Sequence, residues 1–238
     1  MNINQFTAPL ATLNTVHVFS DFTSDQSDVD FIDTVTDTGT AAVGDEVNGV
    51  MVLTPSDGTV ADNDEASIHT ANEIFKFGTN REIYGLAKLR FVETTAGVYN
   101  VAFGFQNAVG ANSIVDDTGL PKVTGSCLVI YKTDGSSVWK VASSCNGTAV
   151  HTTSNRAAVG STDYKLEIEC KDFDGVTMTV LFKVDDEYLK DTNGLVIRHS
   201  VAIASATEMN GYVACKLGAG TNNDTTSIDY VYFAQTRV

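Results

Sequence analysis

From residue 83 onward, the sequence alternates apolar and polar side chains in short runs that end at Gly, Asn, Asp or Ser. In the run from Ile83 to Phe91, the apolar side chains fall on one face, and Lys88 and Arg90 fall on the other. A period of two is typical of strands with one face in a core and the other in water, and helical periodicity is nearly absent. The pattern therefore predicts an all-β protein.

Further runs repeat this alternation at intervals of about ten residues. We expect one hairpin at Thr94 to Gly97 and another at Asp134-Gly135, because Asp and Gly tolerate the backbone of tight turns. Many short antiparallel strands predict a two-sheet sandwich of the jelly-roll type. The further runs are Tyr99 to Phe105, Cys127 to Lys132, Val138 to Ser143, Tyr164 to Lys171, Val176 to Val184, Leu195 to Ile203, Tyr212 to Leu217 and Ile228 to Phe233.

The length of 238 residues suits one sandwich domain, and neither a low-complexity linker nor an internal repeat divides it. We expect the jelly roll to occupy residues 41–238. Residues 1–40 are expected to form an N-terminal arm and an acidic entry segment, with a first strand and a loose leader as the alternative. Residues 62–65 could begin one short helical turn. The arm residues expected to contact a neighbouring subunit are Phe6, Leu10, Leu13, Val16, Val18 and Phe19.

The chain carries 15 basic and 30 acidic side chains, a net charge of −15, which repels nucleic acid. The start has no basic segment followed by an apolar run, and no apolar stretch could span a bilayer. We therefore expect no nucleic-acid partner, no secretory signal and no membrane association. Cys127, Cys145, Cys170 and Cys215 lack zinc-site spacing, so buried reduced thiols are expected. A Cys127–Cys145 disulfide is the alternative, if the hairpin between them has a three-residue loop.

Glu167 and Glu169 form the fragment most similar to a catalytic pair, since carboxylates two residues apart on a strand lie roughly 7 Å apart on one face. Laminarinase-like glucanases of concanavalin-like fold use Glu-x-Asp-x-x-Glu in such a place, and this sequence departs from that motif at the second and third carboxylates. Lys165 and Lys171 flank the glutamates on their own face, and no aromatic residue shares it. We therefore expect a solvent-facing strand and no enzymatic activity.

Other candidate sites also have simple structural explanations, and no cofactor is expected. The four histidines, His17, His69, His151 and His199, form no recognisable nucleophile motif with a serine. Trp139, the only tryptophan, is expected in the core, with a sugar-binding platform as the alternative. Four acidic clusters could bind calcium or simply be hydrated, and none has EF-hand spacing. These clusters are Asp28/Asp30/Asp33, Asp62/Asp64/Glu65, Asp116/Asp117 and Asn222/Asn223/Asp224.

Three fragments follow one another in the order Tyr164-Lys-Leu-Glu-Ile-Glu169, Val180-Leu-Phe-Lys-Val-Asp-Asp186 and Ile228-Asp-Tyr-Val-Tyr-Phe-Ala-Gln-Thr-Arg237. Together with the entry Val18-Phe19-Ser20-Asp21-Phe22, this order resembles tailed-phage virion proteins of concanavalin-like jelly-roll fold. Asp185-Asp186 stands where that family has Asp-Gly. The resemblance covers residues 80–238 and the short entry.

The resemblance implies a non-enzymatic structural subunit of the phage particle, which either decorates the capsid lattice or forms part of a fibre or tail appendage. We expect the first, a capsid decoration protein on the capsid exterior, made in the host cytoplasm. Its partners would be the major capsid protein and copies of itself, as a trimer or a dimer. A glycan-binding module of a phage tail or fibre appendage is the alternative, with Trp139 as its sugar contact.

Overall fold

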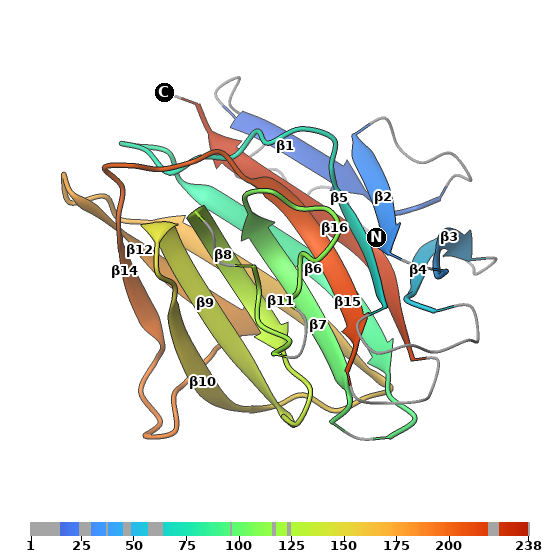
Figure 1. Cartoon of the computed structure of the whole chain (residues 1–238). Coiled ribbons are helices and arrows are strands. Elements are labelled where there is room, and N and C mark those ends of the chain that lie inside the picture. The colour runs from blue at the N-terminus through green and yellow to red at the C-terminus, as the bar shows by residue number, and fades with distance from the viewer. Residues whose placement is uncertain are drawn as a thin grey trace.

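A computed structural model of the chain describes residues 15–23, 30–36, 38–44, 49–56, 64–95, 97–115, 118–122, 125–218 and 224–237. Within these ranges the chain forms sixteen β-strands and no helix. These ranges accordingly offer no helix long and apolar enough to cross a membrane. Two antiparallel sheets stack face to face with the core between them (Figure 1). The predicted all-β, two-sheet jelly roll is confirmed.

The nine-stranded sheet consists of β1 (Thr15–Ser20), β3 (Thr40–Gly44), β4 (Val50–Thr54), β6 (Ile83–Val92), β11 (Thr162–Lys171), β12 (Thr177–Val184), β13 (Glu187–Tyr188), β14 (Arg198–Ala202) and β16 (Thr225–Thr236). Its order is β13-β12-β11-β6-β16-β4-β3, with β14 also paired to β12 and β1 also paired to β16. The seven-stranded sheet consists of β2 (Phe31–Thr36), β5 (Glu65–Thr70), β7 (Tyr99–Gln106), β8 (Gly125–Lys132), β9 (Val138–Gly147), β10 (Val150–Ala157) and β15 (Asn210–Leu217). Its order is β10-β9-β8-β7-β15-β5-β2.

The core is built from the alternate residues of each strand that face the opposite sheet. The Phe233 ring of β16 stacks on Phe103 with 5.8 Å between centroids, and it meets Phe105 edge-on at 5.2 Å. Gly85 of β6 leaves room for this cluster, since a Cβ there would lie 2.9 Å from the Phe105 ring. Burial of these aromatic side chains supplies much of the hydrophobic stabilisation that joins the two sheets.

The predicted hairpin at Thr94 to Gly97 is wrong, because β6 belongs to the nine-stranded sheet and β7 to the seven-stranded sheet. The chain between these strands crosses from one layer to the other, and the Gly97 amide donates to Glu93 Oε2 at 2.6 Å. The predicted hairpin at Asp134-Gly135 is confirmed, since it joins β8 to β9 and Gly135 has a φ of 70°. A local turn signal does not reveal which sheet the next strand joins.

The sandwich begins earlier than the predicted boundary at residue 41. β1 pairs with β16, and β2 pairs with β5, so each of the two sheets takes a strand from residues 15–36. Val18 of β1 is buried in the core. The predicted helical turn is also wrong, because Glu65–Thr70 forms the strand β5. Residues 1–14 lie outside the described ranges.

All four cysteines are free thiols, so the alternative Cys127–Cys145 disulfide is wrong. The register of β8 and β9 places Cys127 opposite Ser144, whose hydroxyl lies 3.3 Å from the thiol. Cys145 is the next residue and points to the other face of the sheet. Burial raises the pKa of Cys127 to about 11, so this thiol stays protonated. Cys127, Cys170 and Cys215 are buried, as expected, and Cys145 is partly exposed.

Candidate functional site

The charged side chains of β11 lie on the outer face of the nine-stranded sheet, the face turned away from the seven-stranded sheet. Leu166 and Ile168 of the same strand point into the core, so the predicted two-sided strand is confirmed. Glu167 is nevertheless only 5% exposed. Side chains of the neighbouring strands cover this glutamate, and the solvated row expected from the sequence is instead a packed polar cluster.

Lysine side chains surround the two glutamates of β11. Lys165 Nζ lies 3.0 Å from Glu167 Oε1, and Lys171 Nζ lies 3.1 Å from Glu169 Oε2. Lys183 of β12 lies between the two carboxylates, 3.7 Å from Glu167 Oε2 and paired with Glu169 Oε1. These contacts hold both carboxylates in fixed positions and balance their charge.

The charge state of Glu169 is set by these lysines. Burial acts to raise its pKa, but hydrogen bonds from Lys183 and Lys171 outweigh burial, and the pKa lies below its ordinary value. Burial acts to lower the pKa of Lys183, but the hydrogen bond to Glu169 and the negative charges of Glu169 and Glu167 together outweigh burial and raise the pKa. A glycosidase needs one carboxylic acid whose pKa is raised so that it can donate a proton. Glu169 instead stays an ionised hydrogen-bond acceptor.

Tyrosines from three other strands share this outer face, so the expectation that no aromatic residue does so is wrong. Tyr84 of β6 donates its hydroxyl to Glu167 Oε2 at 3.0 Å. Tyr232 of β16 lies beside it, with 6.0 Å between the ring centroids. On the opposite side, Lys183 Nζ lies 4.9 Å from the centroid of the Tyr188 ring of β13. Aromatic rings therefore flank the charged cluster on both sides.

A recess of about 260 Å³ opens on this face between the charged cluster and the tyrosines of β6 and β16. Tyr84 and Tyr232 line it together with Glu82, Glu169 and Lys171. The Tyr232 hydroxyl is buried and has no hydrogen-bond partner among the described residues. An unsatisfied buried polar group costs about 1–3 kcal/mol, so this hydroxyl lowers the stability of the chain locally.

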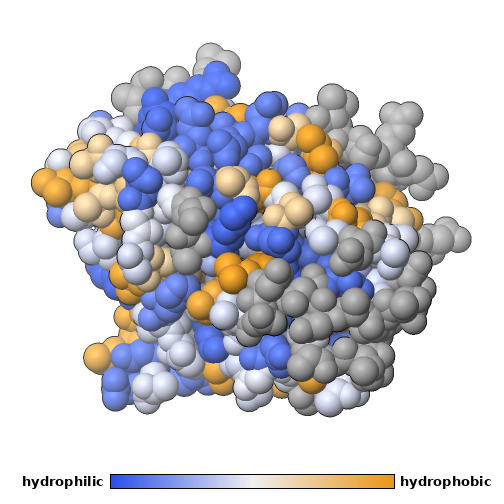
Figure 2. All heavy atoms as spheres, viewed as in Figure 1, coloured by the Kyte–Doolittle hydropathy of each residue, from blue (hydrophilic) through white to orange (hydrophobic). Residues whose placement is uncertain are grey.

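The middle of the outer face of the seven-stranded sheet, over β9, β8, β7 and β15, is covered by residues 107–115 and 118–122. Ile114 and Leu120 of this segment pack on an apolar surface of the sheet. Viewed from this side, apolar groups lie in small patches among hydrophilic ones (Figure 2). The apolar surface beneath the segment consists of Ala102, Cys127, Val129, Tyr131, Ala142, Tyr212 and Ala214.

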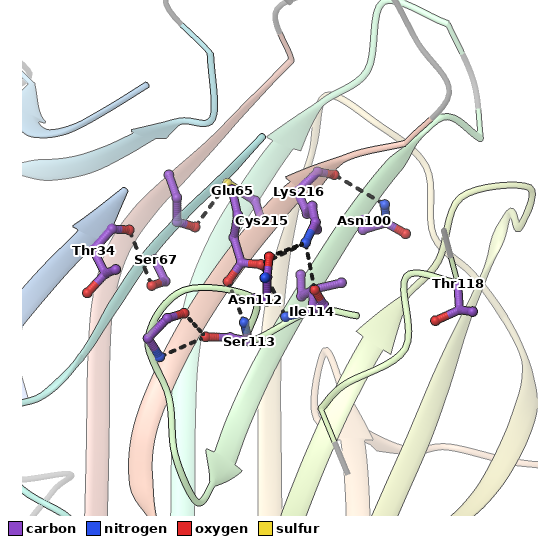
Figure 3. A network of polar contacts seen from close by, with 12 residues as sticks. Thr34, Glu65, Ser67, Asn100, Asn112, Ser113, Ile114, Thr118, Cys215 and Lys216 are labelled. Carbon is purple, nitrogen blue, oxygen red and sulfur yellow. Dashed lines mark hydrogen bonds and ion pairs between the residues drawn. The ribbon is translucent and has the colours of Figure 1, made fainter. Parts of the chain in front are cut away.

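A buried ion pair holds the covering segment in place (Figure 3). Glu65 Oε1 accepts the Ser113 amide at 2.8 Å, and Lys216 Nζ donates to the Ile114 carbonyl at 2.8 Å. Glu65 and Lys216 are each 1% exposed and lie 3.3 Å apart. Their bonds are used within the fold, so this pair anchors the segment and does not form a site.

His199 of β14 links the two sheets near one edge of the sandwich. Its Nδ1 lies 2.7 Å from Ser143 Oγ of β9, and its Nε2 lies 2.9 Å from Thr152 Oγ1 of β10. Burial, and then the nearby His151, lower the pKa of His199 to about 4. A hydrolytic triad needs a carboxylate on the second ring nitrogen. That nitrogen meets Thr152 here and Ser143 is buried, so the contact lacks the carboxylate of such a triad and joins the two sheets.

Trp139 lies in the core, as expected. It is fully buried and meets Phe91 edge-on at 5.9 Å and Tyr164 edge-on at 5.1 Å. The alternative role of Trp139 as a sugar contact is wrong, because neither face of the indole reaches the surface.

The six residues predicted to contact another subunit divide into three groups. Phe6, Leu10 and Leu13 lie outside the described residues. Val18 packs in the core of its own chain, which corrects its predicted role as a contact. Val16 and Phe19 are accessible on β1, and their contact with another subunit stays a prediction.

The predicted calcium clusters are only partly described. Asp30, Asp33, Asp64, Glu65 and Asp224 fall within the described ranges. Among these ranges, no three or more His, Cys, Asp or Glu side chains gather in a way that could hold a metal ion. The clusters' other members lie outside them, and calcium binding stays an untested alternative. Those members are Asp28, Asp62, Asp116, Asp117, Asn222 and Asn223.

No known protein family and no curated protein matches the sequence. Solved structures match it in fold. An endo-1,3-beta-glucanase from Streptomyces sioyaensis has a TM-score of 0.61 at 14% identity, over 95% of this chain and 98% of that one. Lectin I from Ulex europaeus, in complex with the methyl glycoside of alpha-L-fucose, has a TM-score of 0.58 at 12% identity, over 94% and 98%. An endo-beta-1,4-glucuronan lyase from the fungus Trichoderma reesei has a TM-score of 0.57 at 12% identity, over 93% and 95%.

None of these likenesses indicates a phage virion, so the capsid partner and the capsid location stay predictions. At such low identity the likenesses establish the fold alone. The chain has the concanavalin-like sandwich fold of lectins and glucanases.

Proposed function

We propose that this protein binds carbohydrate, without cleaving it, on the outer face of the nine-stranded sheet. The observation that carries the proposal is the recess where Tyr84 and Tyr232 adjoin Glu169 and Lys171. Tyrosine rings offer apolar surface to the C–H faces of a sugar, while ionised carboxylates and ammonium groups bind its hydroxyls.

The structural neighbours support the same proposal. Proteins of this fold include a lectin solved with a methyl glycoside and enzymes whose names refer to glucan and glucuronan. In the present chain, residues 107–115 and 118–122 pack over the middle strands of the seven-stranded sheet, whereas the outer face of the nine-stranded sheet has an open recess. We therefore assign sugar binding to the latter face.

Replacing Tyr84 with alanine is expected to weaken glycan binding on the order of tenfold, equivalent to about 1.4 kcal/mol. The substitution removes both the ring that lines the recess and the hydroxyl bonded to Glu167. The measurement is a glycan microarray, followed by affinity electrophoresis in the polysaccharide that binds best.

Two further variants make this experiment specific. Tyr84→Phe keeps the ring and is expected to retain most of the affinity, while Val150→Ala changes an exposed apolar residue of the other sheet and should have no effect. A correctly folded Tyr84→Ala protein with undiminished affinity would show that sugar binds elsewhere. An array with no bound glycan would remove the proposed function.

The bound polysaccharide is expected to remain intact. Glu169 has a lowered pKa and is held by two lysines, so it cannot supply the proton that a glycosidic leaving group requires. Reducing ends and unsaturated products should stay at the level of a Glu169→Gln control during prolonged incubation. Release of product that disappears in this variant would show instead that the face is catalytic.

A further inference from the structure

One row of residues crosses the outer face of the nine-stranded sheet at right angles to the strands. Each member is paired directly with the next by the strand register, so all six side chains point to the same face. Six strands contribute one residue each, in the spatial order β1, β16, β6, β11, β12 and β13. The cross-strand row consists of Phe19, Tyr232, Leu86, Glu167, Lys183 and Tyr188.

Exposure is uneven along the cross-strand row. Phe19 at one end is 47% exposed and Tyr188 at the other end is 39% exposed, whereas Tyr232, Leu86 and Glu167 between them are buried. Two accessible aromatic rings thus lie at the ends of a row whose middle is covered by neighbouring side chains, apolar around Leu86 and charged around Glu167. Five inter-strand spacings separate them, a distance of about 24 Å.

Two hollows in the surface lie next to the cross-strand row. The recess of about 260 Å³ lies next to Tyr232, whose buried hydroxyl lacks a partner in the described part of the chain. Tyr188 lines a larger groove of about 980 Å³ at the edge of the sandwich. The walls of this groove include Arg156, Asp185 and Val196, and Arg156 Nη2 lies 2.5 Å from Asp185 Oδ2. The cross-strand row therefore connects the recess to the groove.

The charges along the path are paired. Glu167 and Glu169 contact Lys165, Lys171 and Lys183, and Lys165 also contacts Asp186 at 2.5 Å. Three ammonium groups thus face three carboxylates, and Glu82, which also lines the recess, adds one negative charge, so the path does not attract an anionic ligand. The whole chain carries a net charge of −15, which repels acidic polysaccharides at long range.

We infer that the ligand is an extended, uncharged glycan that lies across the strands from Phe19 to Tyr188 and continues into the edge groove. This inference rests on the proposed function and specifies its substrate class. A monosaccharide or disaccharide fills only the recess beside Tyr232. A longer chain also reaches Tyr188, so affinity depends on the length of the glycan.

The test uses β-1,3- and β-1,4-linked glucose oligomers and mannose oligomers, from disaccharide to octasaccharide, with oligogalacturonides as the acidic comparison. Isothermal titration calorimetry on the full chain is expected to show affinity that rises with length in a neutral series and levels off once the oligomer spans the row. Tyr188→Ala should lower affinity about tenfold for the octasaccharide and leave the disaccharide unchanged. Leu195→Ala, an exposed residue of the same loop region that is absent from the row, is the matched control.

Equal affinity for short and long oligomers would overturn the inference, as would an effect of Tyr188→Ala that is the same at every length. Preference for the oligogalacturonides would overturn the assignment of an uncharged ligand. If no oligomer of any kind binds, the proposed function itself fails. If binding requires Tyr84 but its affinity does not change with oligomer length, the proposed function is supported and the inference of an extended ligand is wrong.

Discussion

Replacing Lys216 with methionine is expected to lower the free energy of unfolding by about 3–5 kcal/mol, the usual cost of removing one partner from a buried ion pair. Lys216 lies 3.3 Å from Glu65 Oε2 and also donates to Asn112 Oδ1 and the Ile114 carbonyl. Its removal leaves a carboxylate without its counter-ion inside the protein, and it releases the segment that covers the seven-stranded sheet. Urea denaturation followed by tryptophan fluorescence measures the change.

Two comparisons show whether burial is the cause. Lys76→Met removes a surface pair with Glu208, whose side chains are 41% and 58% exposed, and should cost at most about 1 kcal/mol. The double variant Glu65→Gln/Lys216→Met should recover part of the lost stability, since it no longer leaves a buried charge unpaired. A Lys216→Met protein as stable as the Lys76→Met protein would contradict the role assigned to the pair.

Acidification from pH 6.5 to about 4 is expected to remove about 3 kcal/mol of stability through His199 alone. The pKa of this buried histidine is lowered from its ordinary value of 6.5 to about 4, so the folded protein keeps the ring neutral while the unfolded chain binds a proton. The contribution of His199 is therefore complete above pH 6.5 and is lost as the pH falls toward 4. Urea denaturation at several pH values measures the change of the free energy of unfolding with pH, which is the slope to be compared.

A His199→Asn variant should be less stable at neutral pH and should lose less stability on acidification than the unmodified chain. His69→Asn is the matched control, because His69 is only partly buried and contacts Thr34 and Thr70 near the other edge of the seven-stranded sheet. The loss of stability between pH 6.5 and 4 in this variant is the comparison for the His199→Asn protein. Identical slopes in the His199→Asn and unmodified proteins would show that the histidine does not couple protonation to folding.

The strands were predictable because alternation is a local property. In β11, Leu166 and Ile168 enter the core and Lys165 and Glu167 face away from it, as the sequence pattern required. The order of strands is not local, and the pattern around Thr94 to Gly97 could not show that β6 and β7 join different sheets. Turn residues specify a reversal of the chain but not the partner of the strand that follows.

The candidate site was only half predictable for the same reason. Glu167 and Glu169 were found on one strand, but the residues that bury and bind them, Tyr84 and Lys183, come from strands that pair with β11 on either side. The alternation did hold a usable signal. Tyr84 neighbours the inward-facing Ile83, and Tyr232 neighbours the inward-facing Phe233, so both rings could have been assigned to an outer face.

How deeply the charged side chains of β11 are buried also could not be predicted from the sequence. Lysines at positions 165 and 171 resemble the flanks of a solvated strand, and a single strand carries no information about the tyrosines packed beside it. Trp139 shows the opposite case, since an aromatic residue that alternates with Lys140 on a strand is correctly assigned to the core. The alternation of side chains along a strand predicts which face of the sheet each side chain points to, while packing between strands decides how much of that side chain is exposed.

The pairing of β1 with β16 determines where attached sequences leave the sandwich. Thr15 lies opposite Thr236, so a segment joined before β1 and one joined after β16 emerge at the same corner. That corner is at the Phe19 end of the cross-strand row and lies five strand spacings away from Tyr188. Immobilisation on a sensor chip through a tag that follows β16 would therefore hold the Phe19 end next to the chip and leave the Tyr188 end facing the analyte.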